Sequence, residues 1–336
     1  MGQETRRALS NTRNTPGVSR GQAMSEGLDS AGLVRLRRRP SRLRLRQIDW
    51  LPYALIAPAL LVTALITIYP AFYAVRISLL DLNLLRVAQA RWVGIANYLK
   101  LLEDDIFRSS VIRTIRWTIS IVTIQMALAL PTALFLNLKF RWRGLARSLI
   151  LIPYVIPTAV ISVIWVYMFD ANFGAMNEIL VRLGVIPSYL NWISDKNLSF
   201  LILVLAMVWS GMPLMAIVLL AALQTFSEDL YEAARIDGAG AWQRFLYVTL
   251  PQLSPTILLL LLLRTMWLSH HVDVIFLVTN GGPGVANYTM PVYSYMLASV
   301  EFKAGYASAV AIVLSLLLLF VAVAYTRKIE QTSEYL

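Results

Sequence analysis

The sequence predicts an all-α protein that crosses a membrane six times. Of its 336 residues, 58% are hydrophobic and the mean hydropathy is +0.63, which leaves too little polar surface for a water-soluble domain of this size. Six apolar segments are each long enough to cross a bilayer core of about 30 Å as a helix. Because backbone polar groups inside a bilayer must be paired within the chain, we expect a helix in each of them. The segments are 52–80, 117–138, 149–169, 200–224, 256–278 and 306–326.

The formal net charge of +11 is concentrated before the first span, above all in the arginine-rich run 35–46. Beside a membrane helix, such a run favours a cytoplasmic anchor that binds anionic lipids. An arm that docks RNA or a protein partner is the alternative; we expect no nucleic acid. The organisation predicted is a disordered cytoplasmic tail (1–48), a membrane domain (49–327) and a short cytoplasmic tail (328–336). Cysteine is absent, which excludes disulfides and thiolate metal sites.

The distribution of lysine and arginine also predicts the orientation. The connection 139–148 has four basic residues and no acidic one, and Arg327 and Lys328 directly follow the last span. Since cytoplasmic loops are enriched in basic residues, this connection and both termini are expected inside, together with the connection 225–255. The remaining connections, 81–116, 170–199 and 279–305, are then expected outside.

The inner connection 225–255 is a polar segment with its own helix signals. Ser227 can cap a helix whose first turn carries two acidic residues, and Gly238 can end it. A second short helix is expected to follow and to end at Pro251. It should present one mostly apolar stripe, formed by Trp242, Phe245, Leu246 and Thr249. Two short helices joined at a glycine turn would offer a soluble partner a compact surface.

The same segment carries a spaced motif, Glu-Ala-Ala at 232–234, glycine after three further residues, and Leu-Pro after eleven more. It resembles the EAA loop of the membrane subunits of binding-protein-dependent ABC importers, and departs from it only at Val248, where isoleucine is commoner. In that family the loop docks into a cleft of the cytoplasmic ATPase subunit. The resemblance implies a type I ABC importer permease fold with a cytoplasmic coupling loop. It implies as coupling residues Glu232, Ala233, Ala234, Asp237, Gly238, Leu250 and Pro251.

Three further short motifs resemble those of the carbohydrate-uptake branch of this family, which includes maltose, trehalose and glycerol-phosphate permeases. They are Trp-Val-Gly-Ile-Ala-Asn-Tyr at 92–98, Trp-Ser-Gly-Met-Pro at 209–213 and Thr-Asn-Gly-Gly-Pro-Gly at 279–284. The resemblance covers about 49–327. Only the tails lie outside it.

The fourth and fifth spans hold the candidate pathway, because sugar contacts in this family come from these two spans. An indole can lie under a sugar ring, and imidazoles and hydroxyls can bond its hydroxyl groups. Ordinary helix packing would explain the same residues. The candidates are Met207, Ser210, Gly211 and Leu214, which share one helix face, and Trp267, His270 and His271.

The fifth span also contains ionisable residues, which are costly inside a membrane. On one continuous helix, Arg264 and Asp273 would lie about 13 Å apart along the axis and could not pair. His270 and Asp273 would be one turn apart, whereas His270 and His271 would diverge by about 100°, so no metal site is expected. In the third span, two prolines four residues apart predict a bend.

The resemblance implies a permease subunit that forms the pathway for a sugar by alternating access in the bacterial inner membrane. It implies a second homologous permease, two ATP-binding cassette subunits and an extracytoplasmic solute-binding protein as partners. No phosphate-binding Gly-x-x-x-x-Gly-Lys-Ser/Thr motif is present, so ATP and Mg²⁺ are expected on the partners, and neither enzymatic activity nor a cofactor on this chain. Two alternatives remain: glycerol phosphate or another polyol derivative, which Arg264 could bind, and a membrane receptor or scaffold without transport.

Overall fold

The computed structural model describes residues 50–334, and the predicted tail 1–48 lies outside them. Contacts divide the chain after Ala59 into two units, the first described only through 50–59 at the start of α1 (Trp50–Thr63). Five helices in the described part are long and apolar enough to span a membrane, and a bent pair makes a sixth candidate. The six predicted segments each overlap one of these candidates. The fold class expected from the sequence is confirmed.

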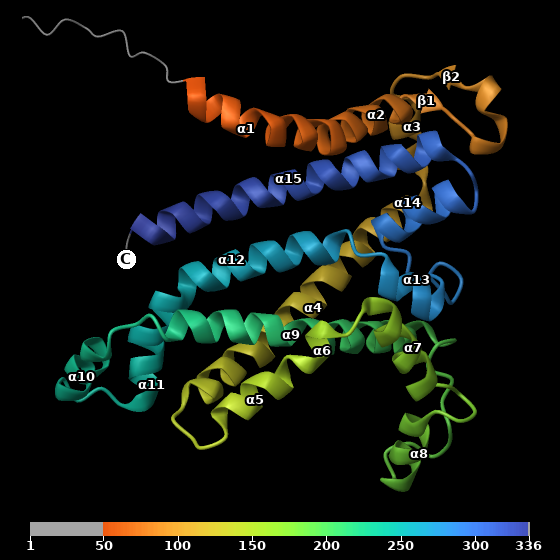
Figure 1. Cartoon of the computed structure of the whole chain (residues 1–336). Helices are drawn as coiled ribbons and strands as arrows, with labels where there is room; N and C mark the ends of the chain where they lie inside the picture. The colour runs from red at the N-terminus through yellow and green to blue at the C-terminus, as the bar shows by residue number, and fades with distance from the viewer. Residues whose placement is uncertain (1–49, 335–336) are drawn as a thin grey trace, which may run out of the picture. The chain divides into compact units, whose positions relative to one another are not determined.

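The remaining elements belong to the second unit (Figure 1). In chain order they are η1 (Ala64–Ile68), α2 (Tyr69–Ser78), β1 (Leu80–Asp81), η2 (Leu84–Gln89), β2 (Arg91–Trp92), α3 (Ala96–Glu103), α4 (Asp105–Asn137), α5 (Arg143–Ile150), α6 (Ile152–Val155), α7 (Thr158–Met168), α8 (Ala175–Arg182), α9 (Lys196–Leu223), α10 (Glu228–Ile236), α11 (Ala241–Arg244), η3 (Phe245–Thr249), α12 (Leu250–Ser269), α13 (Asp273–Thr279), α14 (Met290–Ser299) and α15 (Ala304–Glu334).

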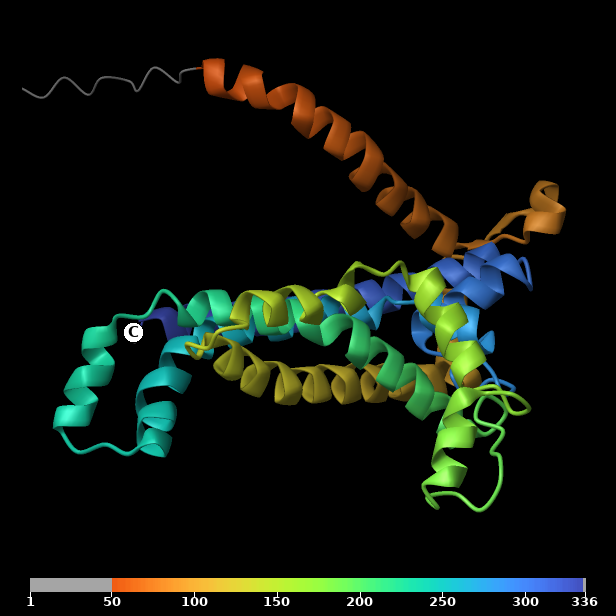
Figure 2. The same cartoon turned by 60° about the horizontal axis from the view of Figure 1, so that its bottom comes forward.

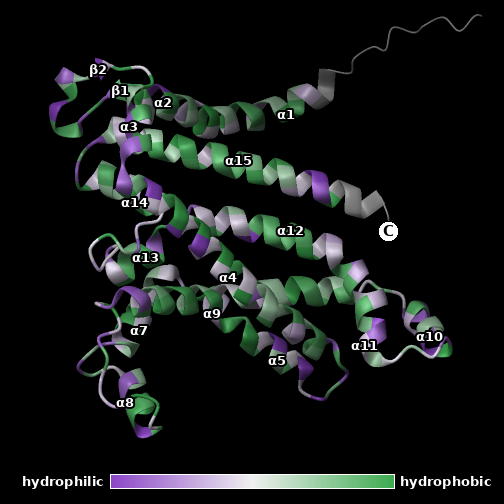
Figure 3. Ribbon diagram, turned by 180° about the vertical axis from the view of Figure 1, so that it is seen from behind, coloured by the Kyte–Doolittle hydropathy of each residue, from purple (hydrophilic) through white to green (hydrophobic). Residues whose placement is uncertain are grey.

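The helices of the second unit pack around α4 and α9, which lie against each other along much of their length. α12 packs on α4 and α9, and α15 packs on α12, α14 and α2 (Figures 1 and 2). Fully buried side chains such as Trp117, Leu203 and Ile275 fill the space between these helices. On α15 the outer side chains are apolar as well: Phe320 is 75% exposed. Figure 3 shows hydrophobic residues along the lengths of α9, α12 and α15, as expected for helices in contact with lipid or another membrane subunit.

Three predicted boundaries differ from the structure by nine residues or more. The first is the start of the second span: α4 begins at Asp105, twelve residues before the predicted start at residue 117. Its extension carries charged residues that a hydropathy criterion excludes, but Asp104 caps it and its buried face continues through Phe107, Ser110 and Thr114. The other two boundaries lie in the fifth span and are described with the site.

The predicted bend in the third span is confirmed. Residues Arg143–Val155 and Thr158–Met168 form two helical segments inclined at 90°. Pro157 stands between them with extended backbone angles (φ −57°, ψ 141°), and its missing N–H cannot continue the first segment. Ile156, the residue before this proline, is also extended, as proline sterics favour.

Two π-helical turns, η1 and η3, each end two residues before a proline. The amide of Tyr69 bonds to the carbonyl of Ala64 ahead of Pro70, and the amide of Leu250 bonds to that of Phe245 ahead of Pro251. A proline ring inside a regular α-helix clashes with the carbonyl four residues back. We attribute the wider turn to relief of this clash, which lets both helices continue through their prolines.

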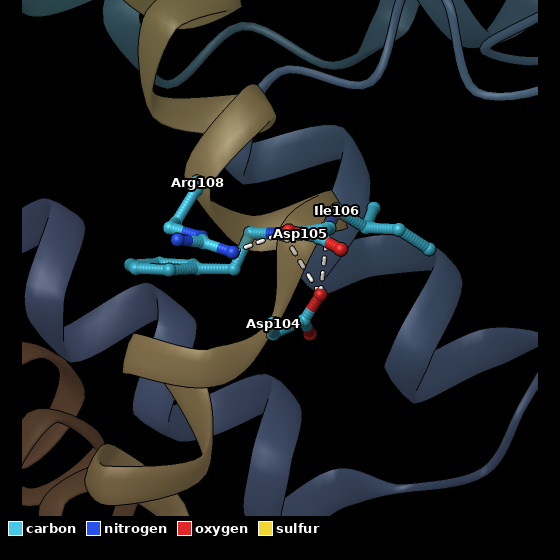
Figure 4. Close-up of polar contacts among 5 residues, drawn as sticks. Asp104, Asp105, Ile106 and Arg108 are labelled. Carbon is cyan, nitrogen blue, oxygen red and sulfur yellow. Dashed lines mark hydrogen bonds and ion pairs between the residues drawn. The ribbon is translucent and has the colours of Figure 1, made fainter.

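Asp104 joins three helices at the start of α4 (Figure 4). One carboxylate oxygen accepts bonds from the backbone amides of Ile106 (2.8 Å) and Phe107 (3.0 Å), and an ion pair between Asp105 and Arg108 follows. The other oxygen accepts the hydroxyl protons of Tyr293 (2.6 Å) on α14 and Tyr306 (2.7 Å) on α15. Burial would raise the pKa of Asp104, but the two tyrosine hydroxyls and the two amides outweigh it and lower the pKa.

The motif at 92–98 forms a turn at the same end of the bundle as Asp104. β1 and β2 pair antiparallel, with Leu80 opposite Trp92, and Gly94 then turns the chain with φ +56°. The buried Asn97 amide donates to the carbonyls of Ser78 (2.8 Å) and Leu80 (2.9 Å). The asparagine therefore ties the end of α2 to the start of α3.

Candidate functional site

The predicted polar segment forms a helical loop that projects from one end of the bundle (Figure 2). Within it, α10 begins as predicted: the Ser227 hydroxyl accepts a bond from the amide of Asp229 (3.2 Å). It ends at Gly238 with φ +79°, where the amide of Ala239 bonds to the carbonyl of Ala234 (2.9 Å) and that of Gly238 to Arg235 (3.0 Å). This is a Schellman motif, which requires a left-handed residue at its glycine position. The spacing from the second alanine of the motif to its glycine is therefore the spacing of a helix C-cap.

The second helix of the loop corrects the sequence prediction. It does not end at Pro251, because α11, η3 and α12 form one apolar helix over Ala241–Ser269. The π-turn η3 carries the chain through Pro251, so the fifth span begins in the loop itself. Leu250 and Pro251 are thus the junction between the loop and the membrane helix. The loop and α12 therefore share one continuous helix.

The loop exposes large apolar side chains together with its acidic residues. Ile236 is 86% exposed, Tyr247 77% and Trp242 69%, and Glu232, Ala233 and Asp237 are exposed as well. Tyr231 on α10 and Thr249 on η3 are 3.1 Å apart through their hydroxyl oxygens, which fastens the two sides of the loop. A rigid, exposed, partly apolar surface of this kind is typical of a protein interface.

A groove of about 1340 Å³ separates the loop from the end of α4 and the start of α5. Lys139 and Glu228 face each other across it at 3.7 Å, but both are strongly exposed, so this ion pair contributes little. The basic connection 139–148 and the loop thus lie at the same end of the bundle, as does the last turn of α15 (Figures 1 and 2).

The candidate pathway residues meet at a second cavity, of about 400 Å³, between α6, α7, α9, α12 and α13. Six of the seven line it: Met207, Ser210, Gly211, Trp267, His270 and His271. Leu214, the seventh, does not. Trp267 is 54% exposed. Whether these residues contact the transported solute stays a prediction.

The fifth span breaks at this cavity, which the sequence prediction of one continuous helix to residue 278 missed. α12 ends at Ser269, His270 caps it with non-helical angles, and α13 starts at Asp273. The predicted one-turn relation of His270 to Asp273 is therefore wrong. Two side chains of α4 supply hydrogen bonds at the end of α12. The Trp117 indole donates to the carbonyl of Leu268 (3.1 Å), and the hydroxyl groups of Thr118 and Ser269 are hydrogen-bonded (3.2 Å).

Arg264 is held beside the cavity by a residue that the sequence analysis did not single out. Its Nε donates to the Gln125 side-chain oxygen (2.9 Å), and the Gln125 amide donates to the carbonyl of Met207 (2.6 Å). Gln125 is fully buried, and the contact links α4, α9 and α12. Gly211 makes room for it, because a Cβ there would overlap the Arg264 guanidinium and the Gln125 amide. The sequence could have pointed to Gln125, because it is a single glutamine within an apolar span.

Other lining residues were also missed, namely Tyr154, Ile156, Thr158, Ile161, Leu268, Val272, Asp273 and Val274. Most come from α6, α7 and α13. Their contribution depends on the bend at Pro157 and the break after Ser269, which bring these segments against α9. Among the described residues, no group of histidine, cysteine and carboxylate side chains could hold a metal ion.

Comparison with protein families identifies residues 125–332 as a binding-protein-dependent transport system inner membrane component. The chain is 33% identical over 276 residues to the sulfoquinovosyl glycerol transport system permease protein SmoG of Agrobacterium fabrum, covering 82% of this chain and 89% of that protein. It is 34% identical over 287 residues to the trehalose/maltose transport system permease protein MalF of Thermococcus litoralis, covering 85% and 96%. Identity to the inner membrane ABC transporter permease protein YcjO of Escherichia coli is 34% over 281 residues, covering 83% and 94%.

Among solved structures, the fold matches a bacterial ABC transporter involved in the import of the acidic polysaccharide alginate, with a TM-score of 0.69 and 22% identity over 84% of this chain and 96% of that one. A second structure of the alginate transporter, in complex with an alginate-pentasaccharide-bound periplasmic protein, gives a TM-score of 0.68. Helix order, the broken spans and the projecting loop therefore constitute a type I ABC importer permease fold. The chain belongs to the family of binding-protein-dependent transport system inner membrane components, the permeases of ABC importers.

Proposed function

We propose that this chain is the permease subunit of a sugar importer. With a second homologous permease it forms the pathway for a sugar that an extracytoplasmic binding protein delivers. Two ATP-binding cassette subunits bind ATP and Mg²⁺ and drive the cycle. Curated relatives with trehalose, maltose or sulfoquinovosyl glycerol in their names support the sugar class.

The observation that carries the proposal is the connection between the projecting loop and the cavity. α12 runs from Leu250 at the loop to Ser269 at the cavity, 20 residues or roughly 30 Å of helix. A rigid helix between an exposed protein-binding surface and a polar cavity can convert movement of the first into opening of the second. ATP binding draws the loops of the two permeases together, the spans rotate, and the pathway opens outward; hydrolysis returns it inward.

Within this proposal each group of residues has a role. Glu232 pairs with a basic side chain of the ATPase, Ala233 and Ala234 allow close approach, and Gly238 sets the turn. The six cavity residues contact the sugar, with the Trp267 indole against its ring. The loop, the basic connection 139–148 and both termini face the cytoplasm, because this connection, which has four basic residues and no acidic one, then obeys the charge rule.

The test is ATP-driven sugar uptake by the complete transporter reconstituted in vesicles. We expect Glu232→Lys to reduce uptake at least tenfold while the chain still inserts and binds the second permease. Glu103→Lys at the end of α3 is the matched control: it reverses an equally exposed charge away from the loop, and uptake should persist. Equal uptake by wild type and Glu232→Lys would overturn the coupling role, and failure of the wild type to transport any sugar would favour a receptor or scaffold.

A further inference from the structure

Arg264 is a buried cation without a buried anion. It is 6% exposed near the C-terminal end of α12, and none of the four ion pairs among the described residues includes it. A charged side chain inside a membrane protein carries a desolvation cost that partners normally offset. Among the described residues its one side-chain hydrogen-bond partner is Gln125, a neutral amide. A hydrogen bond that only holds α4 against α12 would not need a charged side chain.

One donor of this guanidinium is unpaired. Arg264 lines the cavity, and its Nη2 atom, which lies against Gly211, is buried and has no hydrogen-bond partner. Gln125 holds the guanidinium through the neighbouring Nε, so the group is positioned before a ligand arrives. A buried donor left unpaired is destabilising, and an acceptor that reaches it would remove this cost.

The opposite charge lies on the same cavity without touching Arg264. Asp273 lines it from the first turn of α13, is exposed and makes no ion pair with the arginine. On one continuous helix the two groups would also lie too far apart to pair; the break after Ser269 places Asp273 on a separate helix from which it lines the same cavity. The cavity thus holds one group that only donates hydrogen bonds and one that, ionised, only accepts them. Its formal charge, with neutral histidines, is zero.

We infer that Arg264 hydrogen-bonds to hydroxyl groups of the transported sugar, and that the cavity binds an uncharged sugar. This inference rests on the proposed function. Each sugar hydroxyl both donates and accepts, so one can lie against the guanidinium and another against Asp273, while the ring lies on Trp267. An anionic sugar would gain from Arg264 but would meet the Asp273 carboxylate in the same 400 Å³. Gln125 is the positioning residue, since it holds the arginine rather than the ligand.

The experiment compares wild type and Arg264→Gln in the reconstituted complex, with the same binding protein in both so that its own selectivity cancels. Trehalose and maltose are the uncharged probes, their singly deoxygenated analogues report hydroxyl contacts, and sulfoquinovosyl glycerol is the anionic probe. We expect Arg264→Gln to raise the half-saturating concentration of the transported uncharged sugar about 10- to 100-fold. It should also abolish discrimination against one particular deoxy analogue, which a purely structural role would leave intact.

Arg113→Gln is the matched control. Arg113 on α4 also has a buried, unpartnered nitrogen, Nη1, but does not line the cavity, so sugar affinity and analogue discrimination should be unchanged. Preferred uptake of sulfoquinovosyl glycerol, lost in Arg264→Gln, would overturn the uncharged class. Unchanged discrimination in Arg264→Gln, with the wild type transporting a sugar, would overturn the role of Arg264. A wild type that transports no probe would instead refute the proposed function.

Discussion

The projecting loop and the cavity are built in different ways although one helix joins them. The loop is assembled from contacts within about thirty residues: a serine cap, a glycine C-cap, and one tyrosine-to-threonine contact. The cavity is assembled from five helices, and its central contact, Arg264 to Gln125, joins residues 139 positions apart. A substitution in the loop should therefore change the loop alone, whereas a substitution at the cavity should affect the packing of the whole bundle.

The largest effect is expected from Gly211→Ala in the cavity wall. The added methyl would overlap both the Arg264 guanidinium and the Gln125 amide, so the three-helix contact must shift. Overpacking of this kind costs about 1 to 3 kcal/mol. We expect a lower thermal unfolding temperature in detergent and loss of sugar uptake. Gly144→Ala on α5, where nothing lies within 4 Å of the new methyl, is the control and should unfold like wild type.

Gly238→Val should affect the loop as strongly but leave the bundle intact. A β-branched residue at φ +79° is strained by about 1 to 3 kcal/mol, which is enough to open the end of α10. Hydrogen exchange should increase in 228–240 but not in α4 or α9, while ATP-driven uptake falls. Gly240→Ala has ordinary backbone angles and space for its methyl, so it should change neither measurement. Increased exchange throughout the bundle would contradict the local construction of the loop.

Asp104→Asn should destabilise the bundle and leave the loop unchanged. The lowered pKa of Asp104 means that its ionised form is favoured by folding. Its contribution is therefore complete above the ordinary pKa of 3.8 and disappears as the pH falls through the lower folded value. We expect a loss of about 1 kcal/mol at pH 7, modest because the carboxylate is partly exposed. Thermal unfolding of wild type and variant should converge below pH 3.8; a constant difference down to pH 2 would exclude Asp104 as the cause.

The smallest effect is expected from Ser227→Ala, which removes one capping bond from α10. Such a cap contributes about 1 kcal/mol, here to a helix that already has two acidic residues in its first turn. Exchange of the first amides of α10 should accelerate several-fold with little change in uptake. Ser227→Asp should restore protection, because aspartate caps equally well; failure to restore it would assign the effect to something other than the cap.

The sequence predicted the loop in more detail than the cavity because capping signals act over a few residues. Ser227 and Gly238 were placed correctly from their neighbours alone. The error in the same segment, the predicted stop at Pro251, concerns a proline that ordinarily ends a helix but is accommodated here by the π-turn η3. Residue preference could not reveal this, because it depends on the backbone adopting a π-turn just before the proline.

For the cavity, the sequence by itself determined which side chains are polar within apolar spans and which of them share a helix face. The end of α12 at Ser269 became clear only from the packing of the helices. Trp117 and Thr118 of α4 form hydrogen bonds there, with the carbonyl of Leu268 and the hydroxyl of Ser269. That stop places Asp273 on α13, from which it lines the same cavity as Arg264. The physical reason is that membrane helices must satisfy every buried polar group, and the partner that does so can come from any neighbouring helix, at any distance along the chain.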